Sequence, residues 1–432
     1  MKENLLEMDW TGLSPDSKFY LFISQDSALL SEYEQGMKLP DAFTIYSVGI
    51  ATARDSLTIH ESPEEVHQGI WDFAELTTEK ARKKYELGPD TRDWKVTLAQ
   101  EDVSRSGPSK RYIAPILYRP FDRRWTYYTG YSRGIICMPR PEVMRHMLSG
   151  TNVALCVGRA GQVIGQGEWN IVACSRHMTD LNLFRRGGNV LFPLYLLEDE
   201  SSKQGALTPD LALRPNLGPR FIGSLCERLG LKTDGAGRLP HTLSAEDIFH
   251  YAYAVFHSPG YRSRYAEFLK IDFPRLPLTS SLELFHALAK LGSELVALHL
   301  MESPELNNHI TTAAGSGEFQ VEKVSYSDET VWLDKAKTRG FRGVPEAVWN
   351  FHIGGYQVCE KWLKDRGPKR GKLGRVLTQD DITHYNRIVV ALNETIRLMK
   401  EIDRVIEEHG GWPDAFVTDK SDLASREPSS QA

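Results

Sequence analysis

The chain has 432 residues, of which 41% are hydrophobic, so it can form a large core and is not disordered throughout. Its formal net charge of -5 excludes a protein that is basic overall. It lacks the run of about 18 apolar residues that a transmembrane helix needs, and its N-terminal segment is too acidic for a signal peptide. We therefore expect a cytoplasmic protein. The five widely spaced cysteines indicate free thiols rather than disulfides or a zinc site.

Residues 1–100 predict an N-terminal α/β part. Phe19–Ile23 is apolar enough for a strand, and Ala42–Ile59 contains two further strand-like runs. A helix is expected from residue 63 to about residue 87. Its start is indicated by a cap, a proline at the first helical position and a glutamate that completes a capping box: Ser62, Pro63 and Glu65.

Residues 101–240 predict a β-rich part followed by a linker. Gly and Pro separate short runs of β-branched and aromatic residues, which predict strands at 113–118, 125–128, 153–157, 169–174 and 190–196. The glycine-rich stretch 158–167 lacks the Lys-Ser/Thr end of a phosphate-binding loop, so we interpret it as a flexible loop. Residues 198–241 have the Gly, Pro and Ser content of a linker or a surface excursion.

Residues 241–310 predict a helical block, with helices that start after Ser244, near Pro259 and near Leu282. In residues 311–416 we expect short strands, including one over Val348–Ile353, and then a long helix after Thr378. Residues 417–432 are polar and are expected to be disordered. The expected fold class is α+β. The last helix carries one apolar stripe, formed by Ile382, Tyr385, Val389, Leu392, Ile396, Met399 and Ile406.

The charge is distributed unevenly along the chain. Residues 105–186 carry a net charge of +9, and all but one of their cations are arginines. The planar guanidinium matches phosphate oxygens or the O6 and N7 atoms of guanine, and tyrosines are interspersed among these arginines. The pattern favours nucleic-acid contact. The alternative is an aromatic core with a solvated arginine rim, in which Asp122 pairs with Arg123 or Arg124 and Arg140 holds the chain.

Several catalytic motifs are missing from the sequence. It contains no Pro-Pro pair, so it lacks the loop with which amino-methyltransferases hold an extruded base, and it has no G-x-x-x-x-G-K-[ST] loop. Asp93 and Lys95 match a nuclease motif only nominally, because the nearest Pro-Asp partners are either distant or crowded against them. The histidines show no metal-ligand spacing. The residues alone therefore indicate a binding module rather than a complete enzyme.

Four long segments carry a family resemblance. Residues 118–130 (YRPFDRRWTYYTG), 138–148 (MPRPEVMRHML), 251–278 and 348–366 strongly resemble the C-terminal specificity region of type ISP restriction–modification enzymes. GIATARD, residues 49–55, resembles the segment that opens that region, with Ala53 where a glycine-like residue is expected. The likeness extends from about Trp10 to Asp403.

The resemblance implies that the chain is the target recognition part of a larger phage-defence enzyme and is not an enzyme by itself. It would recognise double-stranded DNA and direct an adenine-N6 methyltransferase domain, in cis or in trans. S-adenosylmethionine, ATP and Mg²⁺ would serve catalytic domains that this chain lacks, and no cofactor, metal or membrane is expected here. The candidate DNA-contacting residues are Arg119, Arg123, Arg124, Tyr128, Arg133, Arg140, Arg159, Gln162, Arg185, Arg186, Thr52 and Arg54.

Two other functions compete with this hypothesis. The apolar stripe on the last helix and the helical block could form a docking scaffold for a methyltransferase or another chain. The alternative, which accounts better for most of their surface, is that they only pack on each other. An independent nuclease is the third possibility.

Overall fold

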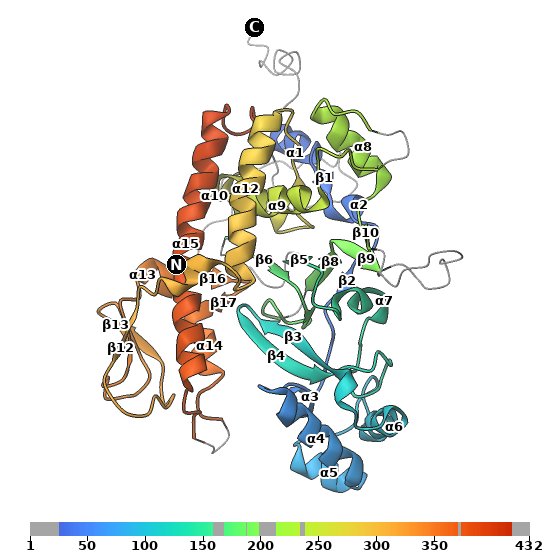
Figure 1. Ribbon diagram of the computed structural model, residues 1–432, viewed down its shortest axis with the longest axis vertical. Coiled ribbons are helices and arrows are strands. Elements are labelled where there is room, and N and C mark those ends of the chain that lie inside the picture. The colour runs from blue at the N-terminus through green and yellow to red at the C-terminus, as the bar shows by residue number, and fades with distance from the viewer. Residues whose placement is uncertain are drawn as a thin grey trace, which may run out of the picture.

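A four-stranded sheet lies at the centre of the molecule, which a computed structural model describes at residues 26–158, 168–186, 188–197, 213–233, 238–369 and 373–416 (Figure 1). Three of its strands are buried along their whole length, which explains why they are mostly apolar instead of alternating. Its strands, in sheet order, are β2 (Ser47–Val48), β8 (Asn189–Pro193), β5 (Ala154–Gly158) and β6 (Val172–Ser175).

A second sheet, of three strands, lies beside the first. The antiparallel hairpin of β3 (Ile113–Arg119) and β4 (Asp122–Tyr127) is its main component, and β7 (Met178–Thr179) pairs with β3 in parallel. Successive side chains of β4 alternate between the buried and the exposed face at its start, which separates Asp122 and Arg124 from Arg123.

Helices of the N-terminal part cover the outer end of this hairpin. Helix α4 contacts β3, β4 and α6, and the group forms the lower end of the molecule in Figure 1. Its members are α3 (Asp55–Thr58), α4 (Pro63–Glu75), α5 (Thr78–Lys84) and α6 (Val96–Ser106).

The opposite end is a helical block in which three long helices pack on one another. Figure 1 shows α12 and α15 side by side along much of their length, with α9 against them. The block contains α9 (Ala245–His257), α10 (Pro259–Arg264), α11 (Ala266–Leu269), α12 (Leu282–His299) and α15 (Gln379–Glu408).

A small antiparallel sheet and a two-stranded hairpin precede the last helix. The sheet has the order β12 (Thr312–Ala314), β15 (Gly340–Arg342), β14 (Thr330–Trp332) and β13 (Ser325–Ser327). It is followed by α13 (Glu346–Trp349), β16 (His352–Ile353), β17 (Tyr356–Gln357) and α14 (Val358–Lys364).

The remaining elements are short and lie around the central sheet and the helical block. They are α1 (Ser27–Glu34), β1 (Met37–Lys38), α2 (Leu39–Ala42), α7 (Pro141–Met144), β9 (Tyr195–Leu197), β10 (Leu213–Pro215), α8 (Pro219–Arg228) and β11 (Arg275–Leu276). No helix among the described residues is both long and apolar enough to cross a membrane.

The α+β class is confirmed, and so are most predicted strands and helix starts. Ser244 and Thr378 both form capping boxes, with Asp247 and Asp381 respectively. The cap at Ser62 differs from the prediction, because the carboxylate of Glu65 accepts from the amide of Glu61, at 3.0 Å, rather than from that of Ser62.

Four predictions about local structure were wrong. Residues 55–58 form α3 instead of a strand, and the helix expected over residues 63–87 is two helices that break at Leu76. The linker contains α8, whose apolar face is buried. Val348 belongs to α13, since its helical turn buries Val348 and Trp349 together. Phe19–Ile23 and the tail from residue 417 lie outside the described residues.

Candidate nucleic-acid interface

A buried network of charges holds the β3–β4 hairpin to the C-terminal helices. The carboxylate of Asp122 is 1% exposed and accepts from Nε and Nη2 of Arg124, at 2.8 and 2.9 Å, and from Nη2 of Arg366, at 3.1 Å. Burial opposes ionisation of Asp122, but Arg366 and Arg124 outweigh it and hold its pKa below the ordinary value. The carboxylate therefore stays charged inside the protein.

The same network continues to the start of α15. Arg124 also pairs with Glu61, which in turn pairs with Arg375. Nη2 of Arg375 donates to Asp381 at 2.8 Å, and Asp381 is the capping-box residue of α15. Arg124 is 7% exposed, so its guanidinium is a structural link between the hairpin and this helix start.

A second inward-facing cluster involves the candidates Arg119 and Thr52. Nη1 of Arg119 donates to Asp180 at 2.9 Å, and the hydroxyl of Thr52 bonds to Asp55, which also accepts from Tyr118 at 2.7 Å. Both Arg119 and Thr52 are buried. Burial, with the nearby charge of Asp55, raises the pKa of Asp180 to about 6 although Arg119 opposes the shift. Their hydrogen bonds go to the protein itself.

The candidate Tyr128 is also buried. It is 6% exposed, and its hydroxyl donates to the backbone oxygen of Pro139 at 3.0 Å. The structure thus places four candidates in the interior: Thr52, Arg119, Arg124 and Tyr128. The sequence alternative, in which Asp122 pairs with Arg124, describes this geometry correctly.

Four other candidates, Arg123, Arg133, Arg185 and Arg186, are exposed. None of them forms an ion pair with any residue that the structure describes. The guanidinium of Arg123 lies 5.8 Å from the Trp125 ring. The backbone amide of Arg185 donates to the backbone oxygen of Gly354 at 2.8 Å. Their charged groups are therefore available to a ligand.

Arg54, Arg133 and Arg140 come together around Cys137. A bridge between Ala51 and Met138 joins their two segments. Burial raises the pKa of the Cys137 thiol, and all three guanidiniums are close enough to oppose the shift. Arg54 stacks 4.9 Å from the Trp94 ring and donates to Pro89, while Arg140 donates to the sulfur of Met138.

The backbone is left-handed at several of these positions. The φ angles are 65° at Ala53, 59° at Arg133, 54° at Arg140 and 68° at Arg186. A residue with a side chain is strained in this conformation, and such strain concentrates at functional sites. In the same segment, Gly49 is required because a Cβ there would lie 2.7 Å from the backbone of Asp180.

Arg159 and Gln162 lie outside the described residues. In the sequence they lie between β5 and β6, which are paired strands of the central sheet.

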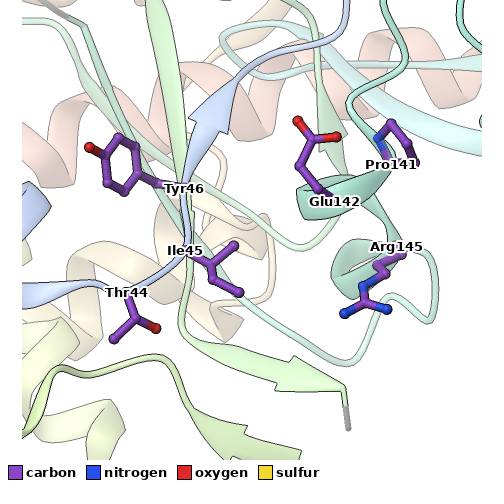
Figure 2. A pocket seen from close by; sticks show the side chains of 6 residues that line it. All are labelled: Thr44, Ile45, Tyr46, Pro141, Glu142 and Arg145. Carbon is purple, nitrogen blue, oxygen red and sulfur yellow. The ribbon is translucent and has the colours of Figure 1, made fainter. Parts of the chain in front are cut away.

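A cavity of about 640 Å³ borders this region, and the sequence did not predict it (Figure 2). One wall is Thr44, Ile45 and Tyr46, and the other comes from α7 with Glu142 and Arg145. The ring of Tyr46 is 41% exposed and stacks at 5.0 Å on Phe192 of the central sheet. The cavity therefore has an exposed aromatic residue on one wall and two charged residues on the other.

A second cleft, of about 730 Å³, lies between the hairpin and the helices. Arg123 lines it from β4, Arg176 from the end of β6, and Arg387 from α15. Arg176 is paired with Glu302, and Arg387 donates to Asn307. Among the described residues, no cluster of three or more histidine, cysteine or acidic side chains could hold a metal ion.

Comparison with known families gives a match to the type ISP C-terminal specificity domain, over residues 41–401. The chain belongs to this family. No curated protein matches it.

The type ISP fold is also found in solved structures. A nuclease-deletion mutant of the type ISP restriction–modification enzyme LlaGI, in complex with a DNA substrate mimic, has a TM-score of 0.61 at 19% identity. That match covers 92% of this chain and 36% of the other. LlaBIII, an ATP-dependent type ISP restriction–modification enzyme bound to DNA, has a TM-score of 0.61 at 19% identity. That match covers 86% of this chain and 24% of the other.

The DrdV–DNA complex gives a TM-score of 0.59 at 21% identity, over 83% of this chain and 36% of the other. The TM-scores show that these structures share a common fold with this chain. The type ISP chain described here spans about a quarter to a third of the length of these structures.

Sequence reasoning missed the acidic and basic residues that hold the hairpin in place. Glu61, Arg366, Arg375 and Asp381 are far from Asp122 in the sequence, and no motif of fixed spacing links them. The signal that could have found Arg366 is its place in the family segment 348–366, where a charged residue follows the aromatic Trp362.

Proposed function

We propose that this type ISP specificity region recognises a specific sequence in double-stranded DNA and directs an adenine-N6 methyltransferase domain to it. The observation that carries the proposal is a set of exposed arginines that form no ion pair with any described residue: Arg123, Arg133, Arg185 and Arg186. Buried ion pairs hold the hairpin that carries Arg123 in place. The DNA complexes of LlaGI, LlaBIII and DrdV support it by analogy.

The candidates divide into two roles on this proposal. The buried residues Thr52, Arg119, Arg124 and Tyr128 position the loops, because their polar groups already have protein partners. The exposed arginines contact phosphates or base edges. Arg54 and Arg140 are half-buried and have some protein partners, so they are secondary candidates for DNA contact. Arg159 and Gln162 stay predicted contacts.

Catalysis belongs to other domains in this proposal. Flipping and methylating an adenine require a pocket with a methyl donor, and the sequence lacks the Pro-Pro loop that such a pocket uses. S-adenosylmethionine, ATP and Mg²⁺ would bind to those domains. The methyltransferase is the partner that the proposal requires, in cis or in trans.

Combined substitution of Arg123, Arg133, Arg185 and Arg186 by glutamine tests DNA binding. We expect weaker binding to duplex DNA and a smaller salt dependence, since each lost phosphate contact reduces the slope by about 1. The matched control is Arg397→Gln with Arg404→Gln, on the exposed face of α15. An unchanged affinity and slope would place the DNA elsewhere.

Target choice is tested by fusing the chain to a methyltransferase domain of the family and mapping methylated adenines with S-adenosylmethionine present. We expect sites that follow this chain, and no methylation by the chain alone. Methylation that follows the other domain's usual target would contradict the proposal.

The competing functions have less support. The buried face of α15 is used inside the protein, with Tyr385, Val389 and Leu392 fully buried, so a docking scaffold would need another surface. Asp93 of the nominal nuclease motif is paired with Arg92 at 2.9 Å.

A further inference from the structure

A cavity of about 590 Å³ is lined in part by His352 and Gly355 of the β16–β17 hairpin, and none of the candidate DNA-contacting residues lines it. Residues from the region before β6, from α10, from the loop after α13 and from α15 line it. Its wall combines apolar side chains with a few polar groups, the usual composition of a small-molecule site. The residues that matter here are Arg262, Glu168, Asn170, Phe351, Ile396 and Met399.

Arg262 is the unusual member of this wall. It is 7% exposed, and its Nε donates to the backbone oxygen of Phe256 at 2.7 Å. Within the described part of the chain, its side chain forms no ion pair and no further hydrogen bond. By contrast, the buried guanidiniums of Arg119, Arg124 and Arg366 each contact a carboxylate. The guanidinium of Arg262 also lies 5.8 Å from the Trp169 ring. A buried cation that has no carboxylate among the described residues is unfavourable unless a ligand supplies an anion.

The electrostatics of the surroundings agree with this geometry. Burial lowers the pKa of Arg262 to about 10, and the charges of Glu168 and Asp403 oppose the shift only from a distance. Asp403 already accepts from the hydroxyl of Ser258 and from the amide of Gly260. Glu168 is exposed at the rim of the cavity. The fork of Arg262 is therefore open to an anion that enters the cavity.

The other lining residues restrict the chemistry of that anion. Asn170 is already bonded to the hairpin, through His352 and Gly354. Phe351, Ile396 and Met399 offer an apolar surface, and the last two are only half-buried although they belong to the predicted core stripe of α15. One guanidinium beside an acidic rim suits a single negative charge better than a phosphate dianion.

We propose that this cavity is a binding site for a small organic acid, whose carboxylate pairs with Arg262 and whose aliphatic part contacts Phe351, Ile396 and Met399. This proposal does not rest on the proposed DNA recognition, since none of the candidate DNA-contacting residues lines the cavity. Occupation would give the buried guanidinium the anionic partner that it lacks among the described residues.

Calorimetric titration of the full chain with sodium hexanoate, at constant ionic strength, tests the site. Hexanol and inorganic phosphate are the comparison probes. Hexanol keeps the aliphatic chain without the negative charge, and phosphate keeps the negative charge without the chain. We expect hexanoate to bind, and Arg262→Met to weaken it about tenfold or more through loss of a charge-assisted hydrogen bond. Glu168→Gln should tighten binding, because it removes a negative charge at the rim. Arg397→Met, an exposed arginine on α15, is the matched control and should change nothing.

A second variant keeps the test valid if Arg262→Met fails to fold. Ala347 is an exposed lining residue, so Ala347→Trp should obstruct the cavity and reduce hexanoate binding without lowering the melting temperature. The proposal would be overturned by an absence of hexanoate binding, by equal binding of hexanol, by tighter binding of phosphate, or by wild-type affinity in both Arg262→Met and Ala347→Trp.

Discussion

Nη2 of Arg366 donates to Oδ1 of Asp122 at 3.1 Å, although the two residues are 244 positions apart in the chain. Both are buried, and the guanidinium also lies 3.5 Å from the Trp362 ring. This bond joins the β3–β4 hairpin, which carries the exposed Arg123, to the end of α14. The orientation of a candidate DNA contact therefore depends on helices from the far end of the sequence.

Asp122→Asn should destabilise the protein strongly. Removing one partner of a buried ion pair leaves a poorly compensated charge and costs about 3–5 kcal/mol. Here two arginines lose the Asp122 carboxylate, which leaves Glu61 for Arg124 and Asp381, 3.9 Å away, for Arg366. Urea unfolding followed by circular dichroism measures the loss. The matched control is Arg397→Gln, which breaks an exposed pair and should cost less than about 0.5 kcal/mol. Equal effects would show that the buried network contributes little.

Local signals in the sequence predicted much of the fold, and contacts between distant segments could not be predicted. The capping boxes at Ser244 and Thr378 lie within four residues, so they locate the starts of α9 and α15 correctly. Helix α8 was missed because Gly218, Pro219 and Gly223 suggest a linker, whereas burial of Phe221 and Leu225 decides its structure.

The candidate site shows the same division. The excess of arginine predicted which part of the chain is rich in cations. Whether a given arginine is buried or exposed depends on whether it has an acidic partner. Arg119 and Arg124 have buried acidic partners 61 and 2 residues away, and Arg185 has none among the described residues. Composition does not distinguish these cases, because all three residues are arginines of the same Arg-rich part of the sequence.

Ala53→Gly should stabilise the protein. Ala53 has a φ of 65°, a conformation that is strained for alanine and free of strain for glycine. After the larger entropy of glycine in the unfolded chain is subtracted, we expect a gain of about 0.5–1 kcal/mol. Thermal and urea unfolding measure it. Ala347→Gly, at an exposed helical position, is the control and should have the opposite sign.

The free energy of unfolding should decrease as the pH is lowered below neutrality, because two histidines are buried. Burial lowers the pKa of His299 from its ordinary value of 6.5 to about 3, and it also lowers the pKa of His257. As the pH falls from 6.5, the unfolded chain therefore binds protons first. Each such histidine then contributes a loss of about 1.4 kcal/mol per pH unit, until the folded pKa is reached.

His299→Gln tests the assignment. The variant should unfold with a smaller pH slope than the wild type between about pH 6.5 and 4. Thr395→Val removes the hydroxyl that lies 2.8 Å from Nε2 of His299 but no titrating group, so it should lower stability and keep the slope. A wild-type slope in His299→Gln would contradict the prediction.

Arg123 and Arg124 are neighbours on β4 that point to opposite faces, and their loss should have opposite consequences. Arg124→Gln removes a guanidinium that bridges Asp122 and Glu61, so it should cost about 3 kcal/mol of stability. Arg123→Gln removes an exposed charge without an acidic partner among the described residues. It should leave the unfolding free energy within about 0.5 kcal/mol of the wild type.

Binding to duplex DNA should show the reverse order, measured at a temperature where both variants are folded. Arg123→Gln should weaken binding, either equally for all sequences with a slope smaller by about 1 if it contacts a phosphate, or at one base pair by about 1–3 kcal/mol if it reads a base. Arg124→Gln should act on DNA only through the hairpin's position, so its salt slope should match that of the wild type. If Arg124→Gln lowered the slope while Arg123→Gln did not, the face of β4 assigned to DNA would be the wrong one.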